Sequence, residues 1–278
     1  MKYSTSKKPL VCMQTQSSCY KGTSKMDVKG VLWHSTGANN PNLKRYIQPS
    51  DKKPSADTYD TAAWLKTLGT NGNKNDLNHS KQSIGMNGWI GKLADGSVAA
   101  VQAMPWDFKP WGCASGSKGS CNNGWIQFEI CEDNLGDKKY FEAIYKEACE
   151  LTAYLCVIHN LDPKGTVTIN GVKVPVILCH ADAHKLGFGS NHGDIYHWFK
   201  KYGKDMDDVR NDVAKLIEAT KIQPEKKEEP KAEAKYVIRK TWEDKKSQIG
   251  AYAVLDNAKK ACDKAGNGFE VYDIKTGI

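Results

Sequence analysis

The chain has 278 residues, of which 40% are hydrophobic, and a formal net charge of +8 at pH 7. This hydrophobic content is enough for a buried core and excludes an intrinsically disordered chain. The positive charge is spread along the chain and favours a polyanionic partner such as an anionic cell wall or a membrane surface. Nucleic acid is not expected, because the chain has no aromatic-studded basic motif.

The N-terminal residues MKYSTSKKPLVCMQ contain lysines, but no apolar stretch of about 7–15 residues follows them. A standard secretion signal is therefore not expected, and no run approaches the roughly 18 apolar residues of a membrane span. We expect a cytoplasmic protein that reaches an outside target only after release from the cell. Most of the nine cysteines are then expected to be reduced thiols. Cys113 and Cys121 flank the small polar segment ASGSKGS, and they either stay free or close a loop as a disulfide.

Strand and helix patterns alternate along residues 1–221. The strand patterns are GVLWHSTG (30–37), the hairpin GWIGKLADGSVAAVQAM (88–104), GWIQFEICE (124–132) and KVPVILCH (173–180). The helix patterns are TYDTAAWLKTLGT (58–70), KKYFEAIYKEACELTAYLCVIHNL (138–161) and KDMDDVRNDVAKLIEAT (204–220). Strands that alternate with helices predict an α/β domain built around one sheet.

A change in composition marks the end of this domain. Residues 222–235, IQPEKKEEPKAEAK, contain two prolines, dense mixed charge and no aromatic residue, which is typical of a semi-extended linker. Residues 236–278 have their own apolar pattern, with a helix from about 255 to 265 between two strands. They predict a small α+β domain of the β-α-β type.

Histidines gather where two predicted strands end. His34 and His180 each follow an apolar run and precede a polar turn, which gives a side chain both rigidity and access to a cleft. The segment SNHGD adds His192 and Asp194. Two imidazoles, one carboxylate and an open position make a catalytic zinc site. His184 stands four residues after His180, as zinc ligands do on a helix, but the glycines that follow shorten any helix there.

The segments VLWHSTG, GWIQFEICE, VILCHADAH and NHGDIYHW occur in an order that resembles the zinc-dependent N-acetylmuramoyl-L-alanine amidases of the amidase-2 family. The resemblance covers residues from about 25 to 200. This family shares its fold with bacteriophage T7 lysozyme and the peptidoglycan recognition proteins, which implies a central mixed β-sheet flanked by helices. The group that looks most similar is the endolysins of phages and prophages of Gram-positive bacteria such as clostridia.

The resemblance also implies roles for individual residues. The zinc ligands that it implies are His34, His180 and Asp194. Glu129 in IQFEICE matches the usual general base of the family. The family often has a lysine two residues before the third ligand, where it stabilises the oxyanion, and this chain has His192 at that position.

Two departures from the family pattern leave alternatives for the ligands. His192 replaces the usual lysine, and the interval from His180 to Asp194 is a few residues longer than usual. His184 is therefore an alternative to His180 as second ligand, and His192 is an alternative to Asp194 as third ligand.

The function that the resemblance implies is a peptidoglycan hydrolase with zinc as cofactor. It would cleave the amide between N-acetylmuramic acid and the L-alanine of the stem peptide. The segments Gly250-Ala251-Tyr252 and Asn257-Ala258 are similar to the wall-associated SPOR-like modules, so residues 236–278 are expected to bind the cell wall. The alternatives are a non-catalytic peptidoglycan-binding protein on the same fold and a zinc hydrolase of another amide in the stem peptide.

Overall fold

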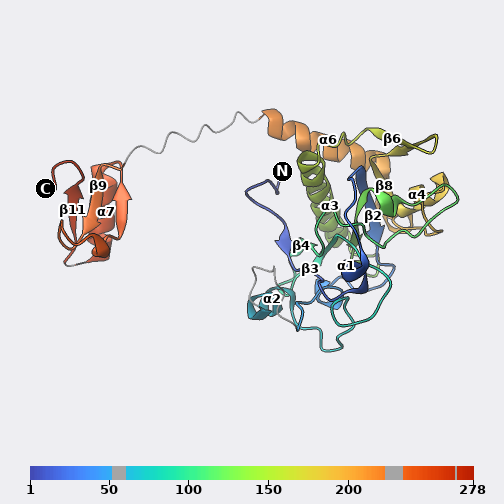
Figure 1. The fold of residues 1–278 in the computed structure, drawn as a ribbon, viewed down its shortest axis with the longest axis horizontal. Helices are drawn as coiled ribbons and strands as arrows, with labels where there is room; N and C mark the ends of the chain where they lie inside the picture. Colours follow the sequence, from blue (N-terminus) through green and yellow to red (C-terminus); the bar gives the residue numbers. More distant parts are fainter. Residues whose placement is uncertain (52–60, 223–233, 267) are drawn as a thin grey trace. The chain divides into compact units, whose positions relative to one another are not determined.

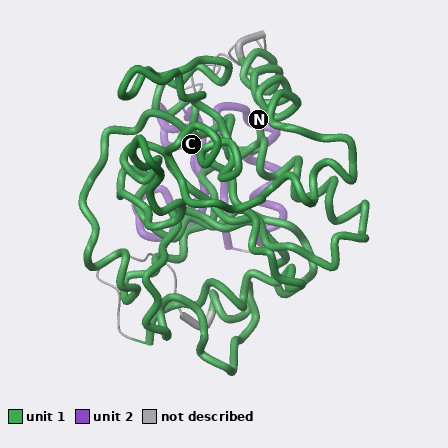
Figure 2. The backbone as a smooth tube through the Cα atoms, turned by 90° about the vertical axis from the view of Figure 1, so that its right-hand side faces the viewer, with its two compact units in different colours: residues 1–222 green, residues 223–278 purple. Residues whose placement is uncertain are grey.

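The computed structural model contains two compact units, Met1–Ile222 and Gln223–Ile278 (Figure 1 and Figure 2). The described residues are 1–51, 61–222, 234–266 and 268–278. Most of the linker predicted over residues 222–235 lies outside them, because residues 223–233 are not described. None of the helices in the described ranges is both long and apolar enough to cross a membrane.

A six-stranded mixed β-sheet forms the centre of the first unit. Its strands, in spatial order, are β1 (Leu10–Val11), β4 (Val98–Gln102), β3 (Gly88–Lys92), β5 (Trp125–Ile130), β2 (Gly30–Ser35) and β8 (Ile177–Cys179). Strands β3 and β4 pair antiparallel, as the predicted hairpin requires, and the other neighbouring strands of this sheet pair parallel. The expected α/β fold with a central mixed sheet is therefore confirmed.

Helices pack on this sheet and around its edges (Figure 1). They are α1 (Ser18–Gly22), α2 (Thr61–Leu68), α3 (Lys138–Ile158), α4 (His180–Leu186), α5 (Tyr196–Phe199) and α6 (Met206–Ile222). Helix α3 packs against β2, β3 and β4, and α6 packs against α3 and β8. Strands β6 (Thr166–Ile169) and β7 (Val172–Pro175) form a separate two-stranded sheet.

The two-residue period of β2 and β5 separates a face that packs on α3 from a second face that carries polar side chains near the carboxyl ends of the strands. The residues that belong to the core shared with α3 are Val31, Trp33, Ile126 and Phe128. The Trp33 indole N–H donates to Thr152 Oγ1 of α3 at 3.0 Å, which fixes the helix on this face. The alternate positions, among them His34 and Glu129, therefore lie on the opposite face. Their Cα atoms are in register on the two paired strands, so their side chains are neighbours.

The single strand predicted over residues 173–180 is wrong, because the structure divides it into β7 and β8. Pro175 ends β7, since proline has no N–H to donate to a longer ladder. The chain then joins the central sheet, where the Val176 carbonyl accepts the Val31 N–H at 2.8 Å. Strand β8 ends at Cys179, and His180 is the first residue of α4 instead of the last residue of a strand. His180 nevertheless stays at the carboxyl edge of the sheet.

The second unit is a three-stranded antiparallel sheet with one helix. Strand β9 (Tyr236–Arg239) lies between β10 (Gly250–Tyr252) and β11 (Glu270–Asp273), and helix α7 spans Leu255–Ala265. The strand–helix–strand unit expected there therefore has an additional strand, β10. The buried Arg239 guanidinium donates to Gln248 Oε1 and to the Trp242 carbonyl, which holds the connection between β9 and β10.

Gly30 offers a test of the packing between β2 and its neighbours. A methyl group at this position would lie 2.2 Å from the Val176 carbonyl oxygen and 2.3 Å from Trp125 Nε1. We expect Gly30→Ala to lower the free energy of unfolding in urea by about 3 kcal/mol, because the sheet must shift to admit the methyl group. Gly72→Ala is the control, since no atom lies within 4 Å of a methyl group there. Equal stability of both variants would contradict this packing.

Candidate metal centre

Three side chains meet at the carboxyl edge of the sheet. His34 Nδ1 lies 3.1 Å from His180 Nδ1 and 3.2 Å from Asp194 Oδ2, and His180 Nδ1 lies 3.6 Å from the same oxygen. Both imidazoles are buried, with 2% and 3% of their side-chain surface exposed. In the part of the chain that the structure describes, no other group of His, Cys, Asp and Glu meets the geometry of a metal site. These three residues are called the cluster below.

The backbone brings each member of the cluster to this edge. His34 lies near the end of β2, and His180 directly follows β8, which is the parallel neighbour of β2. The Ala181 N–H donates to the Asp194 carbonyl oxygen at 3.1 Å and so ties the loop after α4 to the first turn of that helix. The cluster therefore depends on long-range strand pairing and on one local loop contact.

The cluster has the donor set and the spacing of a zinc site. Two imidazoles and a carboxylate are zinc ligands, and a tetrahedral ion with bonds of 2.0–2.1 Å separates its ligands by about 3.3 Å. The three separations in the cluster, from 3.1 to 3.6 Å, lie on both sides of this value. The residues present therefore fit a zinc ion.

The pKa values of the three cluster residues also favour a cation at this position. Burial opposes the charge on His34, but the hydrogen bond to Asp194 and the charges of Glu129 and Asp194 raise the pKa of His34 to about 9. Burial lowers the pKa of His180. Burial also disfavours the Asp194 carboxylate, but hydrogen bonds from both histidines hold its pKa well below the usual range. A proton on His34 Nδ1 thus faces two acceptors, Asp194 Oδ2 and His180 Nδ1, at the position where a metal ion would share all three groups.

The outer nitrogens of both imidazoles have partners that the sequence analysis missed. His34 Nε2 lies 2.8 Å from Gln127 Oε1, and His180 Nε2 lies 3.2 Å from Ser190 Oγ. Such partners orient metal-binding histidines in general. A signal for Gln127 was present, because the period of β5 places it on the same face as Glu129.

Glu129 lies beside the cluster on β5, in register with His34. Its Oε2 atom is buried and has no hydrogen-bond partner among the described residues. Burial raises the pKa of Glu129 to about 7, with a further rise from Asp194 and an opposing effect of His34. A carboxyl group with a pKa near neutrality can both accept and return a proton at physiological pH.

The two alternative ligands from the sequence, His184 and His192, lie outside the cluster. His184 is exposed on α4, and its Nδ1 lies 3.3 Å from the carbonyl oxygen of Gly189. His192 is also exposed, stacks on His180 with ring centroids 4.5 Å apart, and places Nδ1 3.1 Å from Ser190 Oγ. The structure therefore brings His180 and not His184 to the cluster, with His192 at its rim.

The N-acetylmuramoyl-L-alanine amidase family matches residues 24–195 of the chain. The protein belongs to this family. The three cluster residues and Glu129 all lie inside the matched range. Among curated protein sequences, none matches the chain.

Several solved structures are similar to this amidase-family chain. The Staphylococcus aureus hydrolase AmiA, in complex with its ligand, is 14% identical with a TM-score of 0.47, and the match covers 75% of this chain and 82% of AmiA. PlyL is 15% identical with a TM-score of 0.45, covering 73% and 93%. A mutant endolysin from Bacillus subtilis is 14% identical with a TM-score of 0.41, covering 73% and 97%.

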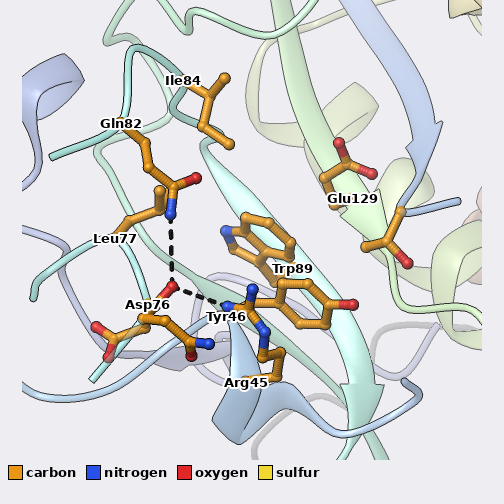
Figure 3. Close-up of a pocket in the computed structure, with 10 residues that line it drawn as sticks. Arg45, Tyr46, Asp76, Leu77, Gln82, Ile84, Trp89 and Glu129 are labelled. Atoms are coloured by element: carbon orange, nitrogen blue, oxygen red, sulfur yellow. Dashed lines mark hydrogen bonds between the residues drawn. The ribbon is translucent and has the colours of Figure 1, made fainter. Parts of the chain in front are cut away.

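A pocket with a volume of about 140 Å³ opens beside Glu129 (Figure 3). Its lining residues are Thr36, Arg45, Tyr46, Asn75, Asp76, Leu77, Gln82, Ile84, Trp89 and Glu129. The Tyr46 and Trp89 rings stack at a centroid distance of 4.9 Å, and Figure 3 shows them between Glu129 and the Asp76 side of the pocket. Arg45 donates to the Asn75 carbonyl oxygen at 2.8 Å. The amidase-family chain thus has an aromatic and cationic pocket next to its candidate base.

The cysteines whose pairing the sequence left open are both buried free thiols. The Cys113 thiol donates to Asn122 Oδ1 at 3.2 Å. Cys113 and Asn122 also belong to the surroundings of Gln127, whose Nε2 donates to Asn122 Oδ1 at 2.9 Å.

The raised pKa of Glu129 predicts a pH-dependent cost to stability. The folded metal-free protein holds this proton up to about pH 7, whereas a glutamate in the unfolded chain loses it near its ordinary value of 4.5. Stability therefore falls as the pH rises between these two values. We expect Glu129→Gln to raise the free energy of unfolding of the metal-free protein by about 2 kcal/mol at pH 8 and by much less at pH 5. Urea denaturation at both pH values measures this, and an equal effect at both would contradict the assignment.

Proposed function

We propose that the protein is a zinc-dependent peptidoglycan hydrolase that cleaves the amide between N-acetylmuramic acid and the L-alanine of the stem peptide. The observation that carries the proposal is the cluster of His34, His180 and Asp194 at the spacing of zinc ligands, with the buried carboxyl group of Glu129 beside it. Membership of the N-acetylmuramoyl-L-alanine amidase family supports the same substrate bond.

Amide hydrolysis needs an activated water, a stabilised oxyanion and a protonated leaving amine. A zinc ion held by the cluster supplies a Lewis acid that polarises the carbonyl group and lowers the pKa of water. Glu129 accepts the proton of the attacking water and returns it to the leaving nitrogen, a role to which its pKa of about 7 is suited. His192 donates a hydrogen bond to the carbonyl oxygen as negative charge develops there. Its exposed position at the rim of the cluster leaves it accessible to substrate.

The pocket beside Glu129 binds the part of the substrate next to the scissile amide. The stacked Tyr46 and Trp89 rings offer an apolar face, and Arg45 offers a cation at the far end. Binding there places the amide near Glu129 because this residue also lines the pocket. This contact with substrate outside the reacting bond supplies orientation.

Two alternative functions remain from the sequence, a non-catalytic peptidoglycan-binding protein and a zinc hydrolase of another amide. A non-catalytic peptidoglycan-binding protein has no use for a buried carboxyl group without a partner, and such a group costs stability. Glu129 therefore favours a hydrolase. A zinc hydrolase of another stem-peptide amide would release a different amino terminus, which chemical analysis of the products distinguishes.

The second unit is proposed to hold the cell wall, as SPOR-like modules do. A wall-binding module joined to the catalytic unit raises the local concentration of the enzyme at its substrate. The separate compact unit at Gln223–Ile278 supports this division of labour. A catalytic unit joined to a wall-binding unit, in a protein that stays in the cytoplasm until lysis, is the arrangement of an endolysin. We therefore propose an endolysin from a phage or prophage of a Gram-positive host.

Substitution of the cluster tests the metal site and the function together. We expect the wild-type protein to bind about one zinc ion and His34→Ala, His180→Ala and Asp194→Ala to bind none, because each removes one of three ligands. His184→Ala is the matched control and keeps both zinc and activity. The measurements are zinc content and the release of free L-alanine amino termini from purified walls, recorded separately from reducing sugar ends.

Two results would contradict this assignment in different ways. Loss of zinc in His184→Ala with retention in His180→Ala would show that the ligand set is wrong. Wall binding by a zinc-loaded wild-type protein that releases no alanine termini would show that the protein is a recognition module.

Removal of the carboxyl group alone separates metal binding from chemistry. We expect Glu129→Gln to keep its zinc and to lower kcat by about 10²–10⁴-fold, since the amide cannot accept the proton of the attacking water. Glu132→Gln is not a suitable control, because Glu132 is buried and accepts hydrogen bonds from Gly37 and His197. The exposed Glu142→Gln is the control and should retain full activity. A kcat within a factor of a few of the wild-type value would exclude Glu129 as the base.

A further inference from the structure

We infer that the main-chain segment Gly112–Cys113 sets the direction of hydrogen bonding at both metal-binding histidines, through Gln127 on one side and Ser190 on the other. As a result both imidazoles carry a proton on Nε2 and turn Nδ1 toward the cluster. Gln127 and Ser190 are positioning residues that act on the metal only through the histidines. The inference rests on the proposed function in that it takes the cluster as the metal site.

The first of these hydrogen-bond chains ends at His34. The main-chain N–H groups of Gly112 and Cys113 donate to Asn122 Oδ1 at 3.3 and 3.1 Å. A main-chain N–H can only donate, so the oxygen of this amide must face the segment. Gln127 Nε2 donates to the same oxygen at 2.9 Å, and this leaves Gln127 Oε1 to accept from His34 Nε2 at 2.8 Å. The order of donors is therefore fixed from the main chain to the imidazole.

The second chain ends at His180. The carbonyl oxygen of Cys113 accepts from the Ser190 N–H at 2.9 Å and from Ser190 Oγ at 3.4 Å. A carbonyl oxygen can only accept, and together with His192 Nδ1 at 3.1 Å from Ser190 Oγ it gives the hydroxyl proton of Ser190 two acceptors other than His180. The lone pairs of Ser190 Oγ remain for the N–H of His180 Nε2 at 3.2 Å. One residue, Cys113, thus orients both histidines, with its N–H on one side and its C=O on the other.

Close packing removes the space in which these groups could turn. A methyl group on Gly112 would lie 2.2 Å from Gln127 Oε1, and one on Gly189 would lie 3.3 Å from His180 Cδ2. Gln127 and Cys113 are fully buried. Glycine at position 112 is therefore required by the close approach of the Gln127 amide, since its φ is not in the left-handed region.

Fixed polarity matters because only an unprotonated nitrogen binds a metal ion. His34 Nδ1 faces Asp194 Oδ2 and His180 Nδ1, whereas His34 Nε2 faces Gln127 Oε1, which can only accept. A metal ion held by His34, His180 and Asp194 would bind the inner nitrogens, and the outer N–H of each imidazole would stay with its hydrogen-bond partner. If Gln127 were absent, His34 would lose the partner that keeps its proton on the outer nitrogen, and metal affinity would fall. Loss of such a partner typically weakens metal binding by about 10–100-fold.

The test uses the full chain with one substitution on each hydrogen-bond chain. Zinc affinity is measured by competition with a chromophoric chelator for Gln127→Leu, Ser190→Ala and Asn122→Leu. Gln127→Glu retains an acceptor for His34 Nε2 and serves as the conservative variant. Gln102→Leu is the matched control, because Gln102 lies on β4 and donates to the Met104 carbonyl oxygen. Thermal unfolding of the metal-free variants reports whether a loss of affinity comes from a damaged fold.

We expect Gln127→Leu and Ser190→Ala each to weaken zinc binding by about 10–100-fold. Asn122→Leu should weaken it as well, although Asn122 does not touch either histidine. Gln127→Glu should bind zinc more tightly than Gln127→Leu, and Gln102→Leu should bind as the wild type does. In proton NMR spectra of the zinc-loaded protein, Gln127→Leu should shift the imidazole N–H signal of His34, and Ser190→Ala that of His180.

Zinc affinities of Gln127→Leu and Ser190→Ala that equal the wild-type value would overturn the inference. A loss that is matched in every variant by a lower unfolding temperature of the metal-free protein would overturn it too, because the residues would then only stabilise the fold. Failure of the proposed function has a different signature. In that case the variants lose zinc affinity as expected, but the zinc-loaded wild-type protein releases no alanine termini from walls.

Discussion

The candidate metal centre depends on the parallel pairing of β2 with β5 on one side and with β8 on the other. Parallel strands place their carboxyl ends at one edge of a sheet, so His34, Glu129 and His180 converge although His34 and His180 are 146 positions apart in the sequence. The core face of the same strands, fixed on α3 through Trp33, holds this edge rigid. The opposite face carries His34 and Glu129 near the carboxyl ends of β2 and β5.

Burial of the Glu129 carboxyl group lowers the stability of the fold, and the same burial raises its pKa to a value that suits acid–base chemistry. Burial keeps a proton on Glu129 up to about pH 7, while Asp194 stays ionised through its hydrogen bonds to the two histidines. A cation at the cluster balances this negative charge, which links metal binding to the stability of the site. Buried acids around two imidazoles therefore suit a metal ion at this edge of the sheet.

Main-chain atoms fix which group donates and which accepts in the hydrogen bonds around the two histidines. Amide and hydroxyl side chains can reverse donor and acceptor, but the N–H and C=O of Cys113 cannot. Gln127 and Ser190 transmit that direction to His34 and His180. The main chain of Gly112 and Cys113 is thus part of the surroundings of the candidate metal centre.

The sequence by itself determined the elements and the chemical types of the site. The two-residue period of 125–130 and the helical period of 138–158 are local patterns, and they predicted β5 and α3. The choice between His180 and His184 was left to the tertiary structure, because it depends on Pro175 ending β7 and on α4 beginning at His180. Gln127 and Ser190 escaped sequence reasoning for a similar reason. The period of β5 places Gln127 on the face of Glu129, but its hydrogen bond to His34, like that of Ser190 to His180, joins segments that only the folded protein brings together.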